Sequence, residues 1–154
     1  MLLRKENVFI DLEVADTDEL FETVGRHMID GGFAKDSFIQ ALKDREKVFP
    51  TGLPSGRESH GSVGVGLPHS DACHVLIPAT AVIRLKKPIR FIMMGSNDVV
   101  IDARVVFMLL LEEGESQLTM LQKLMDIIQD DDFMKKIMDC ASPDELFELL
   151  KDLI

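Results

Sequence analysis

Apolar residues recur with a helical spacing in the first third of the chain. Asp16 and Glu19 have the spacing of a capping box, and the apolar residues after them return every three or four positions. This pattern predicts a helix that runs from about Asp16 to the glycine pair at 31–32. A second helix is predicted over 36–47, because its apolar residues again form one stripe and Pro50 cannot continue it.

The middle of the chain changes to a strand-like pattern. Apolar residues and glycines alternate over 63–67, which predicts a short strand with a glycine face. Apolar segments at 80–85, 89–93 and 103–111 predict three more strands. The last of them is almost uniformly apolar, so we expect it at the centre of the sheet.

Helical spacing returns towards the C-terminus. Helices are predicted over 116–129, with Leu118 on the buried stripe, and over 133–140. Another begins at Ser142, where a serine, a proline and a glutamate have the spacing of a capped N-terminus. Two helices, several strands and then further helices predict an α/β (α+β) fold, in which a mixed sheet is flanked by helices. With no linker along the chain, we expect a single domain over residues 1–154.

Composition narrows the class of protein. The 154 residues are 46% hydrophobic, enough for a full core without disulfides or a structural metal, and Cys73 and Cys140 follow no spacing pattern. A net charge of −10 with no basic run argues against nucleic-acid binding. The longest apolar run, Val105–Leu111, is far shorter than the ~20 residues of a membrane span. The N-terminus lacks the features of a signal peptide, so we expect no membrane insertion and a cytoplasmic location.

Three of the four histidines lie close together in the sequence, at His60, His69 and His74. A neutral imidazole can act as a nucleophile, a base or a metal ligand near neutral pH. His69 stands out because Pro68 precedes it at the end of the predicted glycine-rich strand, which fixes the backbone and presents the ring at the strand end. His69 is therefore the first candidate for chemistry.

A metal site made of His60, His69, Cys73 and His74 is an alternative. It is disfavoured because Cys73 and His74 are adjacent and point in different directions, and no second cysteine pair completes a tetrahedron. A serine hydrolase is weaker still, since the chain has no Gly-x-Ser-x-Gly elbow. We expect no metal.

Several ordered motifs together resemble one protein family. The chain is similar over nearly its whole length to the enzyme IIA component of the bacterial sugar phosphotransferase system, in the fructose/mannitol-type superfamily and its galactitol-like branch. The motifs that carry the resemblance are Asp44-Arg45-Glu46-Lys47, Phe49-Pro50-Thr51-Gly52-Leu53, Gly64-Val65-Gly66-Leu67-Pro68-His69, Pro78-Ala79 and the closing segment 142–150.

The resemblance implies that His69 accepts a phosphoryl group from phosphorylated HPr and passes it to a cysteine of an enzyme IIB, with Arg45 holding the phosphoryl oxygens. A guanidinium suits that role, because its fork neutralises charge on several oxygens at once. No cofactor is implied. Leu53, Gly64, Gly66 and Leu67 are expected to shape an apolar approach surface for the partners. The full set of expected site-lining residues is Thr51, Leu53, Gly64, Gly66, Leu67, Pro68, Gln117, His60 and His74.

One position departs from the family pattern. Many members have a second histidine where this chain has Gln117, and a glutamine amide can donate a hydrogen bond but cannot become cationic. Either His60 or His74 compensates, or nothing does. A second function also stays open, in which the same phosphohistidine is a regulatory signal that a partner reads.

Overall fold

The structure is a computed structural model that describes residues 2–55 and 63–154. Within these ranges one five-stranded sheet has the order β1-β4-β5-β3-β2. The strands are β1 (Leu3–Leu12), β2 (Gly52–Leu53), β3 (Gly64–Gly66), β4 (Ala79–Ile92) and β5 (Val100–Leu110). The sheet is mixed: β1 pairs parallel with β4, and β3 pairs parallel with β5, whereas β4 with β5 and β2 with β3 are antiparallel.

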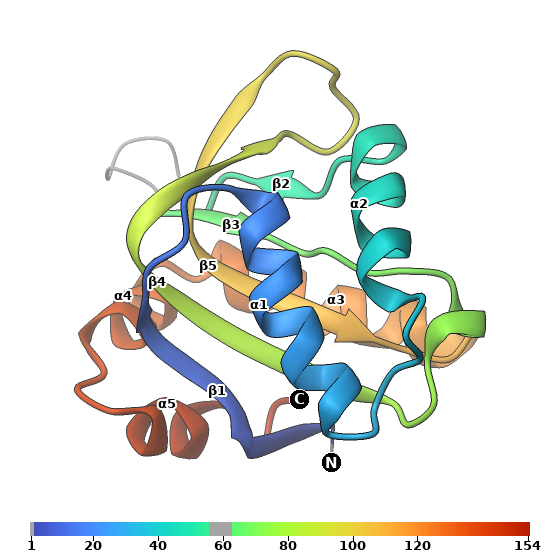
Figure 1. The fold of residues 1–154 in the computed structure, drawn as a ribbon. Helices are drawn as coiled ribbons and strands as arrows, with labels where there is room; N and C mark the ends of the chain where they lie inside the picture. The colour runs from blue at the N-terminus through green and yellow to red at the C-terminus, as the bar shows by residue number, and fades with distance from the viewer. Residues whose placement is uncertain (1, 56–62) are drawn as a thin grey trace.

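Helices cover both faces of the sheet (Figure 1). They are α1 (Thr17–Asp30), α2 (Phe38–Val48), α3 (Glu115–Gln129), α4 (Asp131–Asp139) and α5 (Pro143–Leu150), with a short 3-10 turn η2 (Ala72–His74). Alternate residues of β5 face opposite sides, so that Val106 and Met108 pack with α1 and α2 while Val105 and Phe107 pack with the C-terminal helices. The predicted mixed sheet flanked by helices is confirmed, and β5 lies at its centre as expected.

Two of the predicted helix starts, at Asp16 and Ser142, are confirmed by capping bonds. The Asp16 side chain accepts a hydrogen bond from the backbone N–H of Glu19, and Ser142 accepts one from Glu145. Leu118, in contrast, is 71% exposed, so its expected place on the buried stripe of α3 is wrong. Among the described residues, no helix is long and apolar enough to cross a bilayer.

The structure corrects the predicted order of elements at the N-terminus. The first element of the described chain is a strand, β1, and not a helix. This strand pairs with the edge of β4. A charged run at 4–6 interrupts the apolar pattern, and a register shift between Leu3 and Val8 breaks the pairing at the same place. The two strands predicted at 80–85 and 89–93 are one continuous strand, β4, with a register shift between Arg84 and Ile89.

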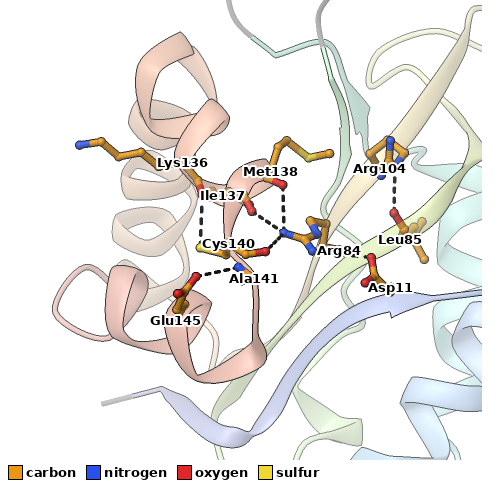
Figure 2. Close-up of polar contacts among 10 residues, drawn as sticks. All are labelled: Asp11, Arg84, Leu85, Arg104, Lys136, Ile137, Met138, Cys140, Ala141 and Glu145. Carbon is orange, nitrogen blue, oxygen red and sulfur yellow. Dashed lines mark hydrogen bonds and ion pairs between the residues drawn. The ribbon is translucent and has the colours of Figure 1, made fainter.

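A buried arginine ties the sheet to the C-terminal helices. Arg84 of β4 is 7% exposed and points towards the end of α4 (Figure 2). Its Nη1 donates to the carbonyl oxygens of Ile137, Met138 and Cys140 at 3.1, 3.0 and 2.6 Å, and its Nη2 lies 3.6 Å from Asp11 Oδ1. One cation thereby satisfies the carbonyls that α4 leaves unpaired at its C-terminal end, where positive charge is also favoured.

Candidate functional site

Backbone pairing holds the segment that carries His69 against the central strand. The chain leaves β3 and continues beside β5, where the N–H of Leu109 donates to the carbonyl oxygen of Pro68 at 3.0 Å and His69 forms a parallel bridge with Leu109. On the other side, Leu67 N–H donates to the carbonyl oxygen of Thr51 at 3.2 Å. Because Leu67 and Pro68 are buried between these contacts, the backbone of His69 has a fixed position.

Among the described residues, the His69 ring has a hydrogen-bond partner at one of its nitrogens. Its Nδ1 lies 2.8 Å from the carbonyl oxygen of Leu67. A carbonyl only accepts, so Nδ1 carries the proton and Nε2 of the neutral ring keeps its lone pair. The ring is half-buried, and this burial is the main cause that lowers the pKa of His69 below its ordinary value, with the positive charge of Arg45 acting in the same direction. The site therefore favours the nucleophilic form.

Arg45 reaches the site from the last turn of α2. Its Nη1 lies 3.0 Å from Oδ1 of Asp71, and its guanidinium carbon lies 5.2 Å from the centre of the Phe49 ring. Its positive charge contributes to the lowered pKa of His69. Sequence reasoning found Arg45 but missed Asp71, which stands two residues after His69. That proximity was the available signal.

Glu46, next to Arg45, fastens α2 to the strand that follows. The Glu46 carboxylate accepts a hydrogen bond from the backbone N–H of Thr51 at 2.8 Å. It also accepts hydrogen bonds from the Thr51 hydroxyl at 2.9 and 3.1 Å. Burial raises the pKa of the Glu46 carboxyl, and the bonds from Thr51 only partly offset that rise. Thr51, expected to line the site, is buried and serves as this anchor. This supporting role of Glu46 was not predicted.

The expected approach surface is wrong for Gly64, Gly66 and Leu67, because all three are buried. A Cβ on Gly66 would stand 2.5 Å from Cζ of Phe91, and one on Gly64 would collide with the carbonyl of Asp102. The glycine face therefore admits the neighbouring strands rather than a partner protein. Leu53 is half-buried and packs against the core.

The described candidates His74 and Gln117 lie in different elements, η2 and α3. His74 is half-buried, and its Nδ1 shares a 2.7 Å hydrogen bond with the Ser37 hydroxyl at the start of α2. A groove of about 450 Å³ between α2 and η2 has Arg45, Asp71 and His74 among its lining residues. Gln117 is half-buried in the first turn of α3. His60 lies outside the described residues.

No group of three or more His, Cys, Asp or Glu side chains within 2–55 and 63–154 has a geometry that could hold a metal ion. Of the four side chains in the alternative metal site, Cys73 is exposed, His74 bonds to Ser37 and the Nδ1 of His69 bonds to Leu67. The fourth, His60, is not among the described residues.

An imidazole whose Nδ1 is hydrogen-bonded beside the central strand, with an arginine whose charge lowers its pKa, is a candidate site for a histidine nucleophile acting on an anionic group. Residues 1–153 match the family model described as "Phosphoenolpyruvate-dependent sugar phosphotransferase system, EIIA 2". The chain belongs to this family, which confirms the resemblance seen in its motifs.

Two curated relatives share parts of the sequence. The chain is 28% identical over 133 residues to the galactitol-specific EIIA component of Escherichia coli O6:H1, a match that covers 85% of each chain. It is 36% identical over 55 residues to the mannitol-specific enzyme IIA component of Staphylococcus aureus strain Mu50. This second match spans 36% of the chain and only 38% of the mannitol-specific relative.

A solved structure shares the whole fold. It is the complex of enzyme IIA and phosphorylated enzyme IIB for mannitol from Escherichia coli, and the similarity has a TM-score of 0.75 at 24% identity. It covers 98% of this chain and 99% of that chain. The arrangement of the described strands and helices is therefore that of an enzyme IIA of the mannitol type.

Proposed function

We propose that this protein is a phosphocarrier that takes a phosphoryl group from the phosphohistidine of HPr onto Nε2 of His69. In the cytoplasm it then passes the group to a cysteine of an enzyme IIB, which serves the uptake of a galactitol-like polyol. The observation that carries the proposal is the 2.8 Å bond between Nδ1 of His69 and the Leu67 carbonyl, because it leaves Nε2 as the nucleophile. Membership of the EIIA 2 family supports it.

The transfer balances without an external acid, base or cofactor. The Nε2 lone pair of His69 forms the new N–P bond, the N–P bond of the donor breaks, and that electron pair returns to the donor nitrogen. Nδ1 of His69 keeps its proton, so the phosphorylated ring is cationic and the Leu67 carbonyl accepts a stronger hydrogen bond from it. The donor ring loses one positive charge and becomes neutral, which balances the positive charge that the His69 ring gains.

Arg45 supplies the positive charge that the moving phosphoryl group needs. Phosphoryl transfer depends on in-line positioning and on neutralising the three equatorial oxygens, and a guanidinium fork does both without changing its protonation state. The stacking of Arg45 on Phe49 limits the orientations of the guanidinium plane. Release follows the same path, as a thiolate of enzyme IIB attacks phosphorus and His69 leaves as neutral imidazole.

The proposed acceptor protein and the proposed polyol are inferred from the similar proteins. A protein of this fold is found in complex with phosphorylated enzyme IIB, and the match that covers 85% of both chains is to a galactitol-specific component. These relationships support an enzyme IIB partner and a galactitol-like system. The galactitol-specific match is the reason we prefer transport to the regulatory alternative.

Intact-mass spectrometry tests the proposal. The purified chain is incubated with phosphoenolpyruvate, enzyme I and HPr, and then with a galactitol-type enzyme IIB. We expect the gain of one phosphoryl group, its loss to enzyme IIB, and no gain in His69→Ala. His27→Gln is the control, because His27 bonds to Asn7 outside the site. Retained labelling in His69→Ala contradicts the proposal, and labelling without onward transfer favours the regulatory function.

A further inference from the structure

Arg45 already holds an anion in the unphosphorylated chain. Its Nη1 and Oδ1 of Asp71 are 3.0 Å apart, with the side chains 31% and 69% exposed. Nε of Arg45 is buried and has no hydrogen-bond partner in the part of the chain that the structure describes. A single carboxylate oxygen thus occupies one donor of the fork, whereas a phosphoryl group offers three oxygens.

We propose that Asp71 is a positioning residue that holds Arg45 beside His69 until the phosphoryl group arrives, and that the phosphoryl group then takes the guanidinium from it. The inference rests on the proposed function, because it describes the same site in two charge states. Asp71 occupies the place of the incoming anion and releases Arg45 when His69 is phosphorylated.

The backbone around Asp71 suits this exchange. The N–H of His74 donates to the Asp71 carbonyl oxygen at 3.2 Å, and the N–H of Lys35 donates to the His74 carbonyl oxygen at 3.0 Å. The His74 ring also bonds to Ser37, so η2 is tied to the start of α2. The backbone of Asp71 is thereby held, while its exposed carboxylate forms only a weak ion pair that is readily exchanged.

Asp71 has a second effect once His69 is phosphorylated. Its carboxylate then lies near a phosphoryl dianion and has lost its cation, and like charges at short range repel. The repulsion raises the free energy of the phosphorylated chain and so favours passing the group onward. Asp71 therefore sets how the phosphoryl group partitions between this protein and its partners.

The equilibrium with HPr tests this directly. Wild type, Asp71→Asn, Asp71→Glu and Asp44→Asn are each mixed with phosphorylated HPr, and the phosphorylated fractions are measured. Asp71→Asn should shift the equilibrium towards the phosphorylated chain by about two- to fivefold, as expected for an exposed ion pair. Asp71→Glu keeps the charge and should restore the wild-type value. Asp44 lines the same groove but bonds to Gln40, so Asp44→Asn is the matched charge control.

Equal shifts in Asp71→Asn and Asp44→Asn, or no shift in either, overturn the inference. If phosphorylated HPr fails to phosphorylate the wild type, the proposed function is contradicted. A second measurement then tests the inference about Asp71. His69 is then phosphorylated with the small donor phosphoramidate, and the Arg45 Nε–H resonance is followed by NMR. A shift on phosphorylation that changes in Asp71→Asn, but not in Asp44→Asn, supports the exchange, and an unmoved resonance refutes it.

Discussion

Nδ1 of His69 donates a 2.8 Å hydrogen bond to the carbonyl oxygen of Leu67, two residues earlier in the chain. The bond fixes the tautomer, so the unprotonated nitrogen of the neutral ring is Nε2. Leu67 is fully buried and its N–H is bonded to the Thr51 carbonyl, so the acceptor does not move freely. The sheet therefore determines which ring nitrogen is available as the nucleophile in the proposed transfer.

Replacing Arg45 should slow phosphoryl acceptance without unfolding the chain. Arg45→Gln removes the positive charge, and we expect the rate of acceptance from HPr to fall on the order of 10²-fold, as for loss of one stabilising donor at a reaction centre. Arg45→Lys keeps the positive charge but loses the forked geometry of the guanidinium, so its rate of acceptance should lie between those of the wild type and Arg45→Gln. Rapid-quench kinetics measure both rates. A wild-type rate in Arg45→Gln contradicts the role given to Arg45.

The pH dependence of acceptance should reflect the lowered pKa of His69. Burial and then Arg45 lower it from the ordinary value of 6.5, while the Leu67 bond and Asp71 act in the opposite direction. Protonation blocks Nε2, so the wild type should keep accepting phosphoryl groups at a pH where a free imidazole is mostly cationic. In Arg45→Gln the pKa should rise. NMR titration of the His69 ring measures both values, and a wild-type pKa at or above 6.5 contradicts this expectation.

Much of the fold is predictable from local sequence patterns. The elements that these patterns do not predict are missed for physical reasons. The helix starts at Asp16 and Ser142 are predictable because capping bonds form between near neighbours. β1 and the two-residue β2 are not predictable, since their pairing with β4 and β3 depends on residues far away in the chain. Leu118 has the spacing of a core residue, yet no element of the described residues buries it.

The site divides in the same way. Motifs predict both His69 and Arg45, and the positive charge of Arg45 contributes to the lowered pKa of His69. The roles of Glu46, Asp71 and Leu67 depend on how α2 and the segment after β3 lie in space, which no local pattern encodes.

Gly66→Ala should destabilise the sheet beneath the site. Its Cβ would stand 2.5 Å from Cζ and 2.6 Å from Cε1 of the buried Phe91 ring, so the ring or the strand must shift. We expect a loss of about 1–3 kcal/mol in the free energy of unfolding, as for overpacking of a core. Urea denaturation measures the loss. In a double-mutant cycle, Phe91→Leu should relieve part of the cost, and simple additivity of the two changes contradicts the explanation.

Glu46→Gln should become relatively more stable as the pH rises. The pKa of Glu46 is raised in the folded state, chiefly by burial, above its ordinary value of 4.5. Its contribution to stability is thus complete below that value and is lost as the pH rises through the folded-state pKa. The wild type minus Glu46→Gln difference in unfolding free energy should therefore fall between acid and neutral pH. Urea titrations across that range measure it, and a difference that grows with pH contradicts the raised pKa.

The most direct test of the central claim is the position of the phosphoryl group on the ring. After incubation with phosphoenolpyruvate, enzyme I and HPr, heteronuclear NMR of the ¹⁵N-histidine-labelled chain identifies the phosphorylated nitrogen. We predict a single phosphoryl group on Nε2 of His69, with Nδ1 still protonated and bonded to Leu67. A phosphoryl group on Nδ1, or on another histidine, contradicts the account.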